Sequence, residues 1–174
     1  MSRWITTTVL SLFLLQPASA ADFVFKDKLT RQLVARTTQI LKNYDPATGQ
    51  LGKGIWICSD QNDMFPLAVA YSYKAPDNTY YKDAKLLETI CSCADPLIKH
   101  MNETGQWIFR KKDNSTWGMI RMPWTYTRWI RAFSLIRDDM PADARDKWTR
   151  ALTLSYENIS KREFAHVHNI PAHQ

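Results

Sequence analysis

The sequence predicts a mostly α-helical fold in which helix pairs with short links flank one inserted β-hairpin near residues 106–120. Three observations support this fold class. Apolar residues recur every three or four positions in several segments, which is the spacing of one helix face. Links that contain Gly, Pro or Asp separate these segments. Two short alternating runs flank the polar turn Asp113-Asn114-Ser115, and this pattern is typical of a hairpin.

The first twenty residues have the pattern of a secretory signal peptide. Arg3 supplies a positive charge, residues 5–15 are apolar, and Ala18-Ser19-Ala20 is a small-residue cleavage site. We therefore expect cleavage after Ala20, a mature chain of residues 21–174, and a secreted or periplasmic location. No second long apolar run follows, so we expect no membrane association after cleavage.

The length and charge favour one domain with an anionic partner. The chain has 174 residues, a net charge of +6 and a pI near 9.3. Export argues against nucleic acid as the natural partner and favours extracellular polymers. No Gly-rich phosphate loop, serine elbow or dinucleotide fingerprint occurs, and we expect no cofactor.

The first two helices of the mature chain are predicted at residues 28–44 and 64–73. The inward face of the first would carry Leu29, Leu33, Thr37, Ile40 and Tyr44. Between the two helices, residues 55–58 are apolar and suggest a buried, strand-like entry. The second helix is apolar almost all round, which predicts burial, and Asp63 is its expected N-cap.

The next helix is predicted at residues 80–100, with Pro96 kinking it or ending its regular part. After the hairpin, a helix is predicted at residues 125–137 and another from Pro141 onward. The inward residues expected of these last two are Trp129, Ile130, Phe133 and Ile136, then Trp148, Leu152, Ser155, Tyr156 and Ile159.

The three cysteines are Cys58, Cys91 and Cys93. An oxidising compartment permits a disulfide. Cys91 and Cys93 lie two positions apart on a predicted helix and point in different directions, so at most one of them is expected to reach Cys58. Their spacing is not that of a metal site.

Trp residues lie among Arg and Lys residues in and around the hairpin. Flat apolar rings beside cations suit an acidic sugar chain or a single-stranded nucleic acid. The candidate substrate-binding residues are Trp107, Trp117, Trp124, Arg121 and Arg128. The competing interpretation is that the Trp side chains fill the core and the cations form a solvated rim.

The histidines near the end form the densest polar group, which consists of His166, His168, Asn169 and His173. The spacing matches no zinc pattern and no carboxylate lies nearby, so we expect no metal. Acid–base work on a sugar is one interpretation, because His exchanges a proton near neutral pH and an Asn amide can stabilise a carboxylate. The other interpretation is that these residues are exposed in a loop.

A second candidate group is the acidic pair Asp60 and Asp63. Paired carboxylates serve glycosidases as acid and base, but helix capping by Asp63 is the competing role. We include Asp60 among the candidate substrate-binding residues.

Together these features resemble the helical-toroid carbohydrate enzymes. Besides the signal peptide and the helix-pair order, the resemblance rests on residues 56–68, on the helix at 124–131, and on the closing residues His168-Asn169-Ile170-Pro171-Ala172-His173. The family comprises the (α/α) barrels of heparinase-like and alginate-lyase-like polysaccharide lyases, with the six-hairpin glycosidases as relatives. The resemblance implies that residues 21–174 are the N-terminal part of such a toroid, truncated at the C-terminus.

The resemblance also implies an activity. In such lyases an Asn neutralises the uronate carboxylate and a His or Tyr moves the proton in β-elimination. Asn169 would take the first role and His168 or His173 the second, although the usual order in the family is Asn-His and here it is His-Asn. The catalytic Tyr is expected downstream, so this fragment would be inactive alone.

The leading hypothesis is therefore a secreted carbohydrate-active protein, a fragment of a polysaccharide lyase that acts on acidic glycans. One alternative is a glycoside hydrolase on the same scaffold. Another is a non-catalytic secreted helical-repeat protein that binds its partner through an aromatic surface.

Overall fold

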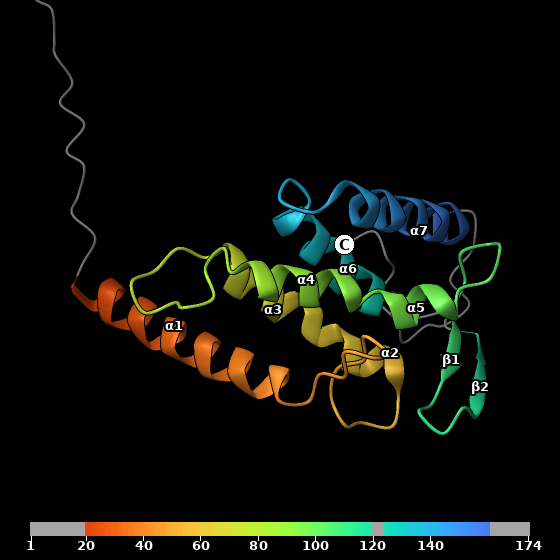
Figure 1. Ribbon diagram of the computed structural model, residues 1–174, viewed down its shortest axis with the longest axis horizontal. Helices are drawn as coiled ribbons and strands as arrows, with labels where there is room; N and C mark the ends of the chain where they lie inside the picture. Colours follow the sequence, from red (N-terminus) through yellow and green to blue (C-terminus); the bar gives the residue numbers. More distant parts are fainter. Residues whose placement is uncertain (1–19, 120–123, 161–174) are drawn as a thin grey trace, which may run out of the picture.

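The computed structural model describes residues 20–119 and 124–160, and this part of the chain is mostly helical (Figure 1). The elements are α1 (Ala20–Leu41), α2 (Ile57–Asp60), the 3-10 turn η1 (Gln61–Asp63), α3 (Met64–Ser72), α4 (Ala84–Ser92), α5 (Asp95–Lys99), β1 (Ile108–Arg110), β2 (Thr116–Met119), α6 (Trp124–Ile136) and α7 (Ala142–Ser160). Figure 1 shows α1 and α7 on opposite sides, with the hairpin at the end remote from the start of α1. Within the described ranges, no helix combines the length and apolarity that a membrane span requires.

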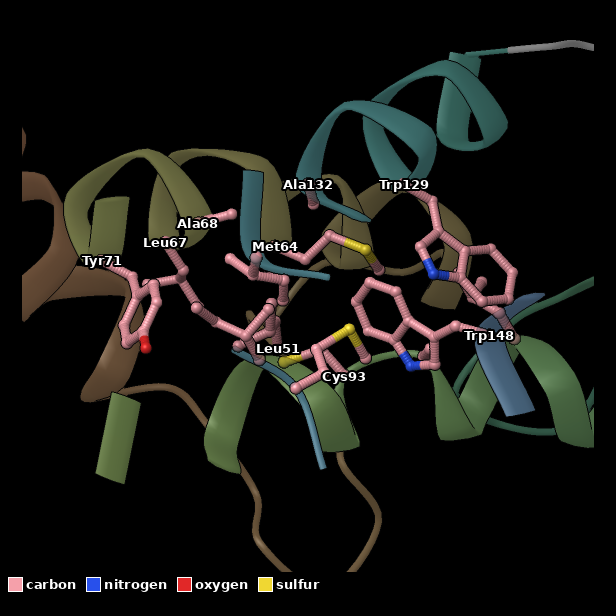
Figure 2. Close-up of a cluster of buried hydrophobic side chains, with 14 of the residues drawn as sticks. Leu51, Met64, Leu67, Ala68, Tyr71, Cys93, Trp129, Ala132 and Trp148 are labelled. Atoms are coloured by element: carbon pink, nitrogen blue, oxygen red, sulfur yellow. The ribbon is translucent and has the colours of Figure 1, made fainter. Parts of the chain in front are cut away.

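Helix α3 lies at the centre of the fold, where it packs against α1, α4 and α6. Its side chains Met64, Leu67, Ala68 and Tyr71 are buried, and Figure 2 shows them within the apolar cluster. A helix surrounded on several sides needs apolar residues all round, and the sequence of α3 provides them. The predicted burial of this helix is confirmed.

Aromatic side chains form the second part of the core. The Trp129 and Trp148 rings meet edge to face with their centroids 5.6 Å apart, and Trp107 lies 5.7 Å from Trp129. The Trp148 indole donates a hydrogen bond to the Cys91 carbonyl at 3.2 Å. These contacts join α6, α7 and the segment that enters β1, so the core spans residues far apart in the sequence.

The predicted hairpin is present. Strand β1 pairs antiparallel with β2, with Ile108 opposite Met119 and Arg110 opposite Thr116, and the register shifts between the two pairs. Within the turn, the Asp113 carboxylate accepts hydrogen bonds from the backbone N–H and the hydroxyl of Ser115. These local hydrogen bonds favour a turn at this position and not a continuation of the strand.

The expected single helix at residues 80–100 is two helices. The Asp83 carboxylate caps α4 by accepting from the Leu86 backbone N–H at 2.6 Å, which fixes the start of this helix at Ala84. The regular part ends at Ser92, and α5 begins at Asp95 with Pro96 in its first turn. Pro has no N–H to donate and is tolerated in a first turn, so Pro96 acts as a start signal for the second helix.

Several residues expected to face inward are exposed. Ile130 is 36% exposed because the buried residues of α6 are centred on Trp129, and the next position is turned about 100° away. Tyr156 is 62% exposed for the same reason, since its neighbour Ser155 faces the core. Leu29 on α1 is also exposed. The strand-like entry is only partly present: Trp56 is extended and pairs antiparallel with Lys111, and Ile57 and Cys58 are buried. Ile55, however, is 66% exposed, and a short helix begins at Ile57.

The predicted N-cap role of Asp63 is also wrong. Its side chain makes no hydrogen bond to the start of α3. The Arg36 guanidinium on α1 instead donates to both Asp63 oxygens, at 2.8 and 3.1 Å. A charged bidentate partner competes well with a backbone N–H for a carboxylate.

Candidate functional site

Lys112 of the hairpin turn binds both the end of α2 and the segment between α1 and α2. The Lys112 ammonium lies 2.8 Å from the Asp60 carboxylate and donates to the Gly52 carbonyl at 2.7 Å. The backbone N–H of Gly54 donates to the same carboxylate at 2.8 Å. Asp60 and Asp63 therefore each have a cationic partner, and the two do not form a pair of free carboxylates.

Close approach of the backbone to Asp60 explains the glycines of this segment. A Cβ atom at Gly52 would lie 2.7 Å from the Asp60 carboxyl carbon, and Gly52 has a φ of +67°. Both conditions favour glycine.

An exposed edge of this assembly carries rings and a cation side by side. We call Trp56, Phe109 and Lys111 the Trp56 strip. The Trp56 and Phe109 ring centroids lie 4.2 Å apart, and the Lys111 ammonium lies 5.1 Å from the centre of the Trp56 ring. Antiparallel backbone pairing of Trp56 with Lys111 holds the two side chains together. All three side chains are half-buried, so each keeps some surface in contact with solvent.

A small pocket lies beside β1, where residues of α2, α5 and the β1 run meet. Its volume is about 10 Å³, and its lining residues are Ile57, Cys58, Pro96, Leu97, His100, Trp107, Ile108 and Arg110. The walls are mainly apolar. Burial and the positive charges of Arg110 and Lys99 lower the pKa of His100, while burial raises the pKa of the Cys58 thiol. Neutral forms of both side chains are thus favoured, which argues against a thiolate–imidazolium pair for nucleophilic catalysis.

The structure places the predicted substrate-binding residues in different surroundings. Trp107 is 5% exposed and packs against Trp129 in the core, so it has no open face on which a sugar could stack. For this residue the core interpretation holds. Arg128 is exposed on α6.

The remaining predicted site residues lie in β2, at the start of α6, or outside the described residues. Trp117 belongs to β2 and Trp124 is the first residue of α6. Outside the described residues lie Arg121 and the expected catalytic group, which consists of His168, Asn169 and His173.

The three cysteines are unpaired, with Cys58 and Cys93 buried. Burial raises the pKa of Cys91 to about 11 and that of Cys93 further still. Among residues 20–119 and 124–160, no group of three or more His, Cys, Asp or Glu side chains is placed to hold a metal ion.

Sequence reasoning did not select Trp56 and Lys111 as site residues. Phe109 and Lys111 lie two positions apart in the alternating run before the turn, which places them on one face of an extended chain, and the sequence offers no other signal for the strip. Trp56 is separated from them by about fifty positions, and pattern alone does not show such a contact.

The Trp56 strip offers an apolar ring surface together with a positive charge. Such a surface suits a ligand that has both apolar faces and negative charge. No family model, curated protein or solved structure matches the chain.

Proposed function

We propose that this protein is a secreted carbohydrate-active protein that binds acidic, uronate-containing polysaccharide, and that the Trp56 strip forms part of its binding surface. The observation that carries the proposal is the placement of the Lys111 ammonium over the Trp56 ring beside Phe109. A sugar ring presents C–H groups that pack on an aromatic side chain, and the carboxylate of a uronate pairs with an ammonium.

Lys111 has to turn aside for a sugar to reach the face of Trp56. The contact that it gives up is worth about 0.5–1 kcal/mol at an exposed site, and a carboxylate partner replaces it. Arg128 is a further exposed cation, on α6, and suits the same class of polyanion.

The scaffold in this proposal is an (α/α) toroid of antiparallel helix pairs, and the proposed reaction is cleavage of the polysaccharide by β-elimination. The Asn169 amide would hydrogen-bond the uronate carboxylate. His168 or His173 would then take the proton from the ring carbon that bears this carboxylate. The glycosidic oxygen would then leave as a carbon–carbon double bond forms in the sugar, and it would become a hydroxyl by accepting a proton from the protonated His or from water. Support for these roles comes from the sequence resemblance and from the acid–base chemistry of His and Asn.

A non-catalytic binding protein is the second candidate. The observation that favours it is the engagement of Asp60 and Asp63 in ion pairs with Lys112 and Arg36. Each carboxylate is held by a cationic side chain of its own, so the two do not form the free, facing acid and base pair of a glycosidase. The same observation argues against a glycoside hydrolase that uses Asp60 and Asp63 as its acid and base.

The test of binding is calorimetry with an oligouronate and with a neutral oligosaccharide of equal length. We expect the oligouronate to bind more tightly. Lys111→Gln should weaken its binding about three- to tenfold, and Trp56→Ala should weaken binding of both ligands by a similar factor. Lys74→Gln, an exposed lysine after α3, is the matched control and should bind like the wild type. Equal affinity in Lys111→Gln and the control would remove the proposed role of the strip.

The test of catalysis uses the full-length protein, in which each turnover by elimination adds ultraviolet absorbance from the new double bond. Asn169→Ala, His168→Ala and His173→Ala should separately lower this rate while oligouronate affinity stays within about tenfold. Glycan cleavage without the absorbance would indicate a hydrolase. Tight binding without cleavage of any acidic glycan would indicate the non-catalytic candidate.

A further inference from the structure

Two residues that line the pocket beside β1 carry a buried hydrogen-bond donor that has no acceptor among residues 20–119 and 124–160. These donors are the Trp107 indole Nε1 and the Arg110 Nε. A buried donor without a partner costs about 1–3 kcal/mol, and a charged one costs more. Most buried donors in folded proteins are paired, so two orphans at one small pocket indicate a place for an acceptor.

The charge balance of the pocket favours an anionic acceptor. Arg110 donates through its Nη1 to the Asn114 carbonyl at 2.9 Å, but no ion pair involves Arg110 within the described parts of the chain. None of the described residues that line the pocket carries a carboxylate. A partly buried guanidinium without a counter-charge is costly, and an anionic oxygen compensates it better than a neutral one.

The size of the pocket limits what can enter. About 10 Å³ accommodates roughly one water-sized group, so one oxygen atom fits and the rest of the ligand stays outside. A planar carboxylate can insert a single oxygen in this way. The apolar walls, which include Ile57 and Leu97, can contact the carbon atoms of the ligand. We propose that this pocket binds a carboxylate group, with one oxygen accepting hydrogen bonds from Trp107 Nε1 and Arg110 Nε.

Two sources share this chemistry: the carboxylate of an acidic sugar and a small free carboxylate. The pocket is distinct from the Trp56 strip, because its lining residues do not include Trp56, Phe109 or Lys111. The inference therefore stands without the proposed function, and the two can fail separately.

His100 provides an independent reporter inside the same pocket. Burial and repulsion from Arg110 and Lys99 lower its pKa. A carboxylate bound to Arg110 would offset part of this repulsion and raise the pKa of His100. The neighbouring Cys58 thiol, whose pKa burial raises, stays neutral near pH 7 and does not mask the effect.

The experiment is a titration of the full chain with sodium acetate at constant ionic strength, followed by NMR. The signals observed are the Trp107 indole N–H and the His100 ring C–H. Saturable shifts of both signals, with a raised pKa for His100, are the expected result. A titration with sodium chloride controls for bulk salt.

Two variants test the assigned donors. Arg110→Gln should weaken acetate binding at least tenfold, and Trp107→Phe, which keeps an aromatic ring but loses the N–H, should weaken it about three- to tenfold. Arg131→Gln, an exposed arginine on α6, should leave binding unchanged. If the core substitution Trp107→Phe prevents folding, the comparison of Arg110→Gln with Arg131→Gln still tests whether the pocket binds acetate.

A parallel titration with an oligouronate distinguishes the sources. Shifts with acetate support a free carboxylate, and shifts with the oligouronate alone support an acidic sugar. Absence of saturable shifts with either ligand overturns the proposal and leaves water as the occupant. Acetate binding that persists in Lys111→Gln, where the strip is impaired, would show that the pocket acts independently of the proposed function.

Discussion

Gln61 is a polar residue at the centre of the fold, and its replacement gives the most direct test of the packing described above. It is fully buried, and its side-chain oxygen accepts from the Leu51 backbone N–H at 2.7 Å. Its side-chain nitrogen donates to the Gly49 carbonyl at 3.0 Å and to the Cys93 carbonyl. One side chain thus satisfies three buried backbone groups and joins the segment before α2 to the end of α4.

The perturbation is Gln61→Met, which keeps the side-chain volume and removes all three hydrogen bonds. A buried group left unpaired costs about 1–3 kcal/mol, so three groups with partial relaxation give a loss of about 4 kcal/mol. At about 2–4 °C per kcal/mol for a chain of this size, Tm should fall by about 8–16 °C.

Urea denaturation followed by circular dichroism measures the loss of unfolding free energy. Gln39→Met, an exposed position on α1, is the matched control and should change stability by less than about 0.5 kcal/mol. A loss below about 1 kcal/mol for Gln61→Met would refute the reasoning, because the three backbone groups would then find other partners at little cost.

Three further predictions concern backbone, pH and thiol chemistry. Gly52→Ala should lower the urea midpoint through a loss of about 1–2 kcal/mol, because its Cβ would meet Asp60 at positive φ; an unchanged midpoint would contradict this. Hydrogen bonds from Thr48 hold the pKa of Asp45 below its ordinary value of 3.8. The stabilisation is thus complete above pH 3.8 and lost as pH falls through the lower folded pKa, and Asp45→Asn should flatten this acid dependence in thermal melts. With its pKa raised to about 11, Cys91 should react with iodoacetamide far more slowly than a free thiol near neutral pH, and rapid labelling of the folded chain would argue against this.

Features that depend on one segment were predictable from the sequence. Helix α3 is apolar all round and is buried, and Trp129 and Trp148 lie on the expected inward faces. The alternation around Asp113 produced the hairpin. In each case the apolar pattern and the local hydrogen bonds favour the same structure. The tertiary contacts then stabilise the structure that the local sequence already favours.

Features that depend on contacts between distant segments were not predictable. Asp63 has the sequence context of a cap, but Arg36, 27 positions away, takes its carboxylate. Trp107 has neighbours typical of a sugar-binding ring, yet it completes a cluster whose other rings come from later helices. The Trp56 strip combines a loop with a strand, and periodicity within either segment carries no information about the other.

The Lys112 ammonium also has a consequence for biosynthesis. It donates to the carbonyls of Leu51 and Gly52, which precede it by 61 and 60 positions. The ribosome adds about 5–20 residues per second, so these carbonyls can hydrogen-bond only to water for roughly 3–12 s before Lys112 is synthesised. The N-terminal segments therefore complete their tertiary structure together with the hairpin, and the amides of Gly54 and Lys112 should lose hydrogen-exchange protection in a single cooperative opening.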